Sequence, residues 1–262
     1  MGRDPLRMYL VLRRGAIAEL ARAGELAGAA AVACLRVFAT QPEHEEAIAA
    51  WRERPGKVCL RARTAAQWEQ VLAEPHTLAG AAEGEAVVAL PPRKRSERGP
   101  LLERLQAMSS ALDPPPEDAP EQPGSVTYAL NPAAVMSSGK TVAQIAHAAV
   151  MAADTGALEA WVAAGCPGRV IAPGAARFAA LAARGACVAR VVDAGLTEVA
   201  PGTVTVLALA HSYRSASAGW IAAARRAGST LASVVNSSAP GNMSTTHHHV
   251  GEVTRSGPSA GW

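Results

Sequence analysis

The most restrictive feature of this sequence is a block that occurs twice, in which a tryptophan precedes Pro-Gly, a basic residue and valine. The first block contains Trp51 and residues 55–58, and the second contains Trp161 and residues 167–170. A period of about 110 to 118 residues is too long for a solenoid repeat. The spacing predicts a duplicated domain, because two units of this size fit within 262 residues.

Hydrophobic patterns around the two blocks predict the same order of elements: a strand, two helices, a strand, a helix and a closing strand. The first set is 7–14, 24–39, 45–52, 55–62, 64–72 and 85–90, and the second is 126–130, 140–153, 157–163, 167–171, 175–183 and 204–209. Strands that alternate with helices favour an α/β fold. We expect tandem three-layer α/β domains over residues 7–92 and 125–211, each a small mixed sheet flanked by helices.

The helix at 140–153 is apolar around most of its circumference, which predicts burial. Ser137 or Ser138 can cap its first turn. Lys140, Gln144 and His147 form a narrow polar stripe, since at about 100° per residue they fall within roughly 60° of one another. A buried helix carries such a stripe only where it meets a polar partner or a cleft. Alternatively, Lys140 alone is typical of a first-turn lysine that extends to solvent, and His147 alone of a hydrogen-bonded core histidine.

A second group of polar residues follows a predicted buried strand at 186–192. Asp193 comes where that strand ends, and Gly195 permits a tight turn. Residues 201–202, Pro-Gly, mark another turn before a strand that carries Thr205. A carboxylate at the C-terminal end of a strand in an open α/β sheet is well placed to line a ligand crevice. The alternatives are an Asx-type turn for Asp193 and strand propensity alone for Thr205.

Together the stretches GKTVAQIAHA, at 139–148, and DAGLTEVAPGTVT, at 193–205, resemble the archaeal and eukaryotic type of peptidyl-tRNA hydrolase, the second class of that enzyme. The resemblance covers about residues 125–211. It implies the fold of that class and hydrolysis of the ester bond of peptidyl-tRNA. It also implies tRNA as the partner, and neither a metal nor an organic cofactor.

The resemblance further implies roles for named residues. Asp193 would orient or deprotonate water. Lys140 would stabilise the developing oxyanion or hold the terminal phosphate, and Thr197 and Thr205 would form hydrogen bonds around the reacting carbonyl. The candidates for substrate binding are Gln144, His147, Arg169 and Gly195.

Three positions depart from the family pattern. Val192 and Leu196 stand where the family usually has basic residues, and Glu198 stands where glutamine is common. The lost positive charge favours a second hypothesis, a non-catalytic tRNA- or protein-binding module that retains the hydrolase fold.

The first copy lacks the polar set of the second. Aligned through the repeat, Lys140 corresponds to Glu25, Gln144 to Ala29 and His147 to Val32, and Asp193 falls nearest Pro75. We therefore predict that residues 7–92 form a degenerate hydrolase-like domain. Because the resembled family commonly pairs as homodimers, we also predict an intramolecular pseudo-dimer of the two copies.

The segments outside the two copies have distinct compositions. Residues 93–124 are predicted to be a linker, with a short helix at 101–112 and a proline-rich, extended end. Residues 212–262 are predicted to be a disordered tail with a weak helix at 218–226. Three consecutive histidines at 247–249 lack a fixed geometry there, which makes a metal site the weaker interpretation of that run.

Charge and cysteine usage limit the setting of the protein. The formal net charge of +3 permits nucleic-acid binding without requiring it. The 4 cysteines are scattered, without a C-x-x-C pair, as expected of reduced thiols. The N-terminus lacks the apolar region of a signal peptide, and no apolar run is long enough to span a membrane. We therefore expect a cytoplasmic protein.

Overall fold

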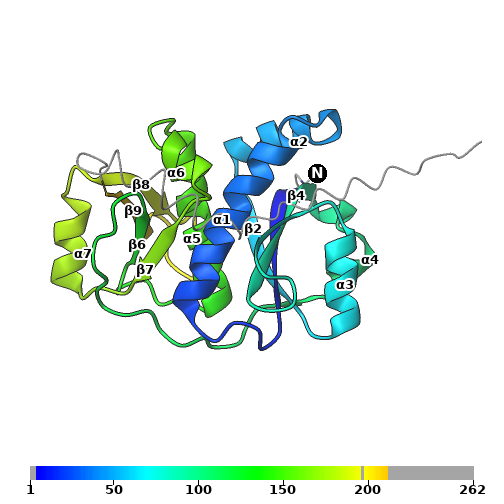
Figure 1. The fold of residues 1–262 in the computed structure, drawn as a ribbon, viewed down its shortest axis with the longest axis horizontal. Helices are drawn as coiled ribbons and strands as arrows, with labels where there is room; N and C mark the ends of the chain where they lie inside the picture. The colour runs from blue at the N-terminus through cyan, green and yellow to red at the C-terminus, as the bar shows by residue number, and fades with distance from the viewer. Residues whose placement is uncertain (1–3, 196–197, 212–262) are drawn as a thin grey trace, which may run out of the picture.

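A computed structural model describes residues 4–195 and 198–211 (Figure 1). The predicted weak helix at 218–226, the histidine run at 247–249, Leu196 and Thr197 lie outside these residues. The chain forms two mixed β-sheets with helices on their faces, so the predicted α/β fold is confirmed.

The first half of the molecule, residues 6–107, contains a five-stranded sheet in the order β3-β4-β1-β2-β5. Its strands are β1 (Leu6–Arg13), β2 (Gly56–Ala62), β3 (Thr77–Gly80), β4 (Ala86–Lys94) and β5 (Gln106–Ala107). The sequence patterns missed β3, a strand of four residues. Its place is fixed by pairing with β4 and by Thr77, whose hydroxyl donates to the carbonyl of Ala30 at 2.8 Å.

The second half, residues 126–210, contains a four-stranded sheet in the order β7-β6-β9-β8. Its strands are β6 (Val126–Leu130), β7 (Gly168–Ile171), β8 (Cys187–Val192) and β9 (Val204–Ala210). The pairing repeats that of the first half: β6 is parallel to β7 and antiparallel to β9, as β1 is to β2 and β4. Strand β8 is antiparallel to β9, as β3 is to β4.

The repeated tryptophan has the same structural role in each half. The buried indole of Trp51 donates to the carbonyl of Gly56 at 2.7 Å, and that of Trp161 donates to the carbonyl of Pro167 at 2.9 Å. A buried indole N–H requires an acceptor, and the Pro-Gly turn supplies it. The tryptophan therefore ties the second helix of each half to the start of the following strand.

Helices α1 (Leu20–Phe38) and α5 (Ser138–Asp154) lie side by side between the two sheets (Figure 1). Each packs on its own sheet and also reaches the other, since α1 contacts β7 and α5 contacts β2. The remaining helices are α2 (Pro42–Glu53), α3 (Ala65–Ala73), α4 (Gly99–Arg104), α6 (Glu159–Ala163) and α7 (Ala175–Ala182), with a 3₁₀ turn at Arg95–Glu97. Helices α3 and α4 pack on the outer face of the first sheet, and α7 on that of the second.

The contact between α1 and α5 is close because small residues line it. A Cβ at Gly24 would lie 2.5 Å from Ile145 Cδ1, and one at Gly28 would lie 3.1 Å from the Cβ of Ala149. One continuous hydrophobic cluster includes the inner faces of both sheets and both central helices. The two halves therefore share a core, which the apolar circumference of each helix requires.

The segment predicted as a linker starts inside the first half. Strand β4 continues to Lys94, and β5 pairs with β2 as the fifth strand of the sheet. The helix predicted at 101–112 is wrong beyond Arg104, where the chain turns extended so that β5 can pair.

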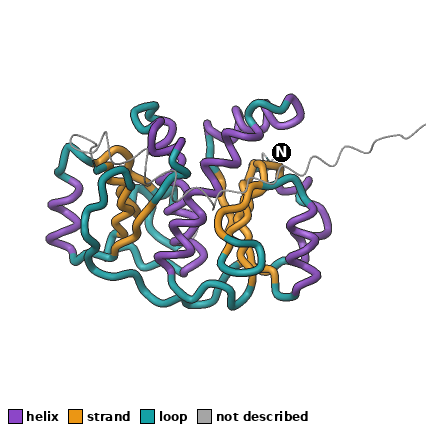
Figure 2. Tube along the Cα trace, viewed as in Figure 1, coloured by secondary structure: helices purple, strands orange, loops and turns teal. Residues whose placement is uncertain are grey.

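The rest of this segment lies along the second half (Figure 2). Asp118 pairs with Arg177, and Glu121 pairs with Arg184 at 2.9 Å. Its acidic side chains thus neutralise two arginines of the second half.

Within the described ranges, no helix is both long and apolar enough to cross a membrane.

Candidate active site

The start of α5 is fixed by two sets of hydrogen bonds. The hydroxyl of Ser137 accepts from the backbone N–H of Lys140 at 3.3 Å and so caps the helix. The backbone N–H and the hydroxyl of Ser137 donate to the carboxylate of Glu198 at 2.6 and 2.8 Å. Glu198, which departs from the family pattern, therefore ties the loop between β8 and β9 to the helix that carries Lys140.

Asp193 is the centre of the polar cluster. It is buried at the C-terminal end of β8, and its Oδ2 accepts from Lys140 Nζ and Gln144 Nε2, each at 2.5 Å. Its Oδ1 accepts from the backbone N–H of Gly195 at 2.8 Å. The structure therefore brings together Lys140, Gln144, Asp193 and Gly195, four of the residues that the sequence singled out.

The turn after Asp193 depends on Gly195. This residue has a φ of +73°, and a Cβ on it would lie 2.5 Å from the backbone nitrogen of Pro201. Glycine is the residue that tolerates both conditions. The backbone of Asp193 is also paired, since its N–H donates to Thr203 and its carbonyl accepts from Gly202, both at 2.9 Å. Both the backbone and the carboxylate of Asp193 are thus held by hydrogen bonds from the described residues of this loop.

The electrostatics of the cluster keep Asp193 ionised. Burial alone would raise the pKa of its carboxyl group, but hydrogen bonds from Lys140, Gly195 and Gln144 outweigh burial and hold the pKa below its ordinary value. His147 behaves in the opposite way. Burial, together with the positive charge of Lys57, lowers the pKa of its imidazole to about 3. His147 is therefore neutral at neutral pH and can orient a ligand by hydrogen bonding, but it is a weak base.

Of the two predicted threonines, the structure describes Thr205, whereas Thr197 lies outside the described residues. Thr205 is fully buried, and its hydroxyl donates to the carbonyl of Val191 at 3.3 Å. The donor of this side chain is therefore used within the sheet, and what remains for a ligand is the acceptor capacity of its oxygen.

Arg169, predicted to bind substrate, does not join the cluster. Its register partner is Thr127, near the start of β6, whereas Asp193 follows β8 at the end of the sheet where β6 terminates. Its guanidinium donates from Nε and Nη2 to Gln122 Oε1 at 3.0 and 2.8 Å. Arg169 belongs to the repeated Pro-Gly block, which marks the scaffold and says nothing of the edge on which a ligand binds.

The first half contains a different polar pair at the related place. When the first residues of α1 and α5 are aligned, Arg22 falls opposite Lys140, and Leu26 and Ala29 fall opposite Gln144 and His147. Alignment through the sequence repeat instead places Glu25, Ala29 and Val32 opposite these residues, and in either alignment the first half lacks the polar set of the second.

Arg22 Nε pairs with Glu85 Oε2 at 3.0 Å, with the two side chains 39% and 50% exposed. In the second half, Lys140 and Asp193 are 18% and 6% exposed. Asp193 directly follows β8, and the residue that directly follows β3 is Ala81, so the structure equates Ala81, and not Pro75, with Asp193.

Residues 129–215 match the family model described as peptidyl-tRNA hydrolase PTH2. The resemblance drawn from the two sequence motifs is thereby confirmed for this segment, which contains the whole Lys140–Gln144–Asp193 cluster. No curated protein and no solved structure matches the chain. In the described part of the chain, no group of three or more His, Cys, Asp and Glu side chains is arranged to hold a metal ion.

One residue near the cluster was missed by sequence reasoning. Lys57 belongs to the first half, yet its charge acts on His147, Lys140 and Asp193. The sequence gives no local pattern that links it to them, because the proximity arises only where α5 packs against β2.

Proposed function

We propose that the second half hydrolyses the ester bond of peptidyl-tRNA and releases the peptide and free tRNA. The observation that carries the proposal is the buried Lys140–Gln144–Asp193 cluster inside the segment that matches the PTH2 family model. An ester between an acyl group and a ribose hydroxyl is an activated bond. The site therefore needs a positioned water and charge stabilisation more than a strong nucleophile.

In the proposed reaction, a water molecule attacks the ester carbonyl carbon, and this water donates a hydrogen bond to Asp193. The carboxylate is a weak base because its pKa is lowered, so its larger contribution is to orient the water and to hold Lys140 in place. The ammonium of Lys140 stabilises the oxyanion of the tetrahedral intermediate. When the intermediate collapses, the bond to the ribose oxygen breaks, and that oxygen takes up the proton released by water.

The remaining candidates have supporting roles in this proposal. Gln144 fixes the carboxylate of Asp193 through its amide, and neutral His147 hydrogen-bonds the substrate beside it. Thr197 is proposed to donate to the reacting carbonyl on the strength of the motif. Thr205, whose hydroxyl already donates within the sheet, is proposed to accept a hydrogen bond from the attacking water beside that carbonyl.

The test is a hydrolysis assay with the purified full chain on peptidyl-tRNA. We expect turnover by the wild type and a loss of about 10²-fold or more in kcat/KM for Asp193→Asn. Circular dichroism controls for folding. Absence of turnover by well-folded wild-type protein would reject the hydrolase and leave the second hypothesis, a binding module that retains the fold.

We also propose that the first half is an inactive partner which covers the central helix of the second, as one subunit covers another in a dimer. Three observations support this: the two sheets share one topology, α1 and α5 share one core, and ion pairs bridge the halves. Arg36 pairs with Glu159 at 3.0 Å, and Arg52 pairs with Asp154.

A further inference from the structure

Lys57 lies on the face of the first sheet that meets α5. Its register partner in β1 is Met8, and the residue two positions along β2 is Cys59. Both Met8 and Cys59 belong to the core shared by the two halves, whereas Val58 and Leu60 pack on the opposite face. Because side chains alternate along a strand, Lys57 points to the shared face. Helix α5 packs against β2 on that face.

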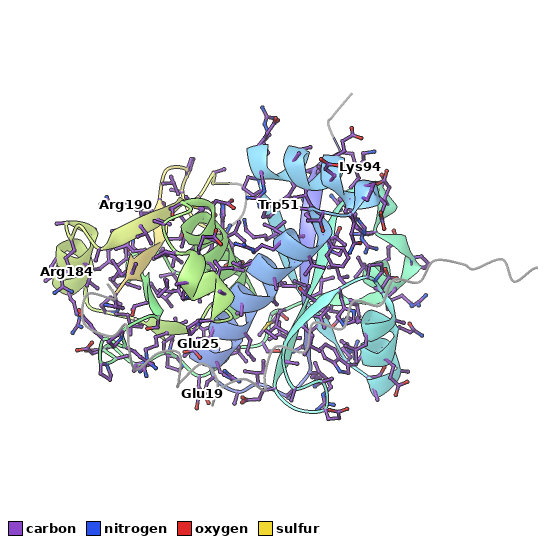
Figure 3. The ribbon with its side chains drawn as sticks, turned by 45° about the horizontal axis from the view of Figure 1, so that its top comes forward. Glu19, Glu25, Trp51, Lys94, Arg184 and Arg190 are labelled. Atoms are coloured by element: carbon purple, nitrogen blue, oxygen red, sulfur yellow. The ribbon has the colours of Figure 1, made fainter. Side chains whose placement is uncertain are left out.

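The amine of Lys57 is held at a defined position there. Its Nζ lies 5.2 Å from the centroid of the Trp51 ring and donates to the carbonyl of Pro55 at 3.4 Å. Trp51, labelled in Figure 3, is in turn fixed by its hydrogen bond to Gly56. As a whole residue, Lys57 is half-buried and not sealed in the core.

Packing does not require a lysine at this position. The equivalent tryptophan hydrogen bonds end at Gly56 in the first half and at Pro167 in the second, so the counterpart of Lys57 is Gly168. A Cβ at Gly168 would lie 2.8 Å from the ring of Tyr128. Where a central helix packs against this strand, the position next to Gly168 is therefore filled by the ring of Tyr128. The equivalent position in the first half, which faces the Asp193 cluster, carries the polar side chain of Lys57.

The groups that face Lys57 explain what the amine can do. These titratable groups are Lys140 and His147 on α5 and Asp193 after β8. Burial first, and then the charge of Lys140, lower the pKa of Lys57 to about 7, while Asp193 opposes the shift. Because Lys140 and Asp193 neutralise one another, Lys57 supplies positive charge that this pair does not. Binding of an anion to the amine would offset the cost of burying it.

We propose that Lys57 binds a phosphate at the 3′ end of the tRNA, so that the substrate site is built from both halves of the chain. The inference rests on the proposed function in taking peptidyl-tRNA as the ligand. It gives the first half a direct contact with substrate in addition to its role as a cover.

The experiment compares Lys57→Met, Lys57→Arg and the control Lys94→Met in the full chain. Methionine matches the length of lysine without its charge, and Lys94 is an exposed lysine of the same half that pairs with Glu97. Two readouts are measured: steady-state hydrolysis of peptidyl-tRNA, and the dissociation constant of deacylated tRNA as a function of salt. Thermal melting checks that each variant is folded.

We expect Lys57→Met to raise KM about tenfold with kcat within about twofold, because the contact is made in the ground state and the transition state alike. The slope of log Kd against log salt should fall by about one, the value for a single lost phosphate contact. Lys94→Met should change neither quantity.

The pH dependence gives an independent readout. A lysine with a pKa of about 7 is charged below that pH and neutral above it, so wild-type tRNA binding should weaken as pH rises from 6 to 8. Lys57→Arg should remove much of this change, since arginine keeps its charge.

The outcomes separate this inference from the proposed function. If the wild type binds tRNA in a Lys57-dependent way but does not hydrolyse the ester, the hydrolase fails and the inference stands. If the wild type hydrolyses peptidyl-tRNA and Lys57→Met matches it in KM, Kd and salt slope, the inference is overturned and the hydrolase stands. No binding of tRNA by the wild type overturns the inference as well.

Discussion

Each half of the molecule places a basic side chain of its central helix against a carboxylate from one loop, which precedes β4 in the first half and β9 in the second. The first half pairs Arg22 with Glu85, and the second pairs Lys140 with Asp193. The first pair lies at the surface, whereas the carboxylate of the second is buried and accepts from two further groups, Gln144 and the backbone of Gly195. Burial and complete hydrogen bonding separate a solvated ion pair from a pre-organised one.

The difference follows from the length of the loop. In the first half, the residues between β3 and β4 form a tight turn, with Ala81 and Glu85 joined by a backbone hydrogen bond of 2.9 Å. In the second half, the chain from Asp193 to Thr203 forms a longer loop. That loop closes on itself through Gly195 and Gly202 and reaches the start of α5 through Glu198. Of the two loops, the longer one carries the buried carboxylate and the shorter one the exposed carboxylate.

The most direct test of this difference between the halves removes each of the two cations in turn. Lys140→Ala should lower kcat/KM for peptidyl-tRNA by about 10²-fold or more, since it removes the group proposed to stabilise the oxyanion. Arg22→Ala should leave kcat/KM within about twofold, because an exposed pair contributes little to the fold and nothing to the site. Both variants are assayed beside the wild type, with circular dichroism as the control. Similar losses in the two variants would show that the halves are not functionally distinct.

A second test asks whether the first half is needed as a cover. Residues 125–211 expressed alone would expose the face of α5 that carries Ile145 and Ala149. An uncovered apolar face favours association, so the fragment should self-associate or precipitate while the full chain sediments as a monomer. Sedimentation velocity at several concentrations measures this. A fragment that is a fully active, well-behaved monomer would contradict the pseudo-dimer.

The smallest expected effect concerns the packing between the central helices. Gly28→Leu should destabilise the chain by about 1–3 kcal/mol, the usual cost of overpacking, because a Cβ there already meets Ala149 at 3.1 Å. Urea denaturation gives the free energy of unfolding. The control is Gly185→Leu, since Gly185 lies in a turn and has no atom within 4 Å of an added Cβ. If both variants are equally stable, the helices do not form the rigid contact described above.

Several features of the fold and the site were predictable from local sequence. The strand at 126–130 was predicted with its observed ends, and the polar stripe of Lys140 and Gln144 meets the partner that a buried stripe demands, Asp193. These predictions depend on periodicity within one element and on a carboxylate at a strand end, both of which short segments encode. The helix at 101–112 failed because pairing of β5 with β2 overrides helical propensity.

The sequence by itself determined the α/β class, the repeated scaffold and the group of residues that surrounds Asp193, because each depends on neighbours along the chain. The tertiary structure alone decided that Lys57 faces this group and that Arg169 does not. Aligned letter for letter, the two Pro-Gly blocks make Arg169 the counterpart of Lys57. The hydrogen bonds of the two tryptophans, however, end at positions that differ by one residue in this alignment. A shift of one residue turns a side chain to the other face of a sheet. Which side chains then meet across the two halves is set by the packing of α5 on β2, a contact between segments about eighty residues or more apart that local pattern does not encode.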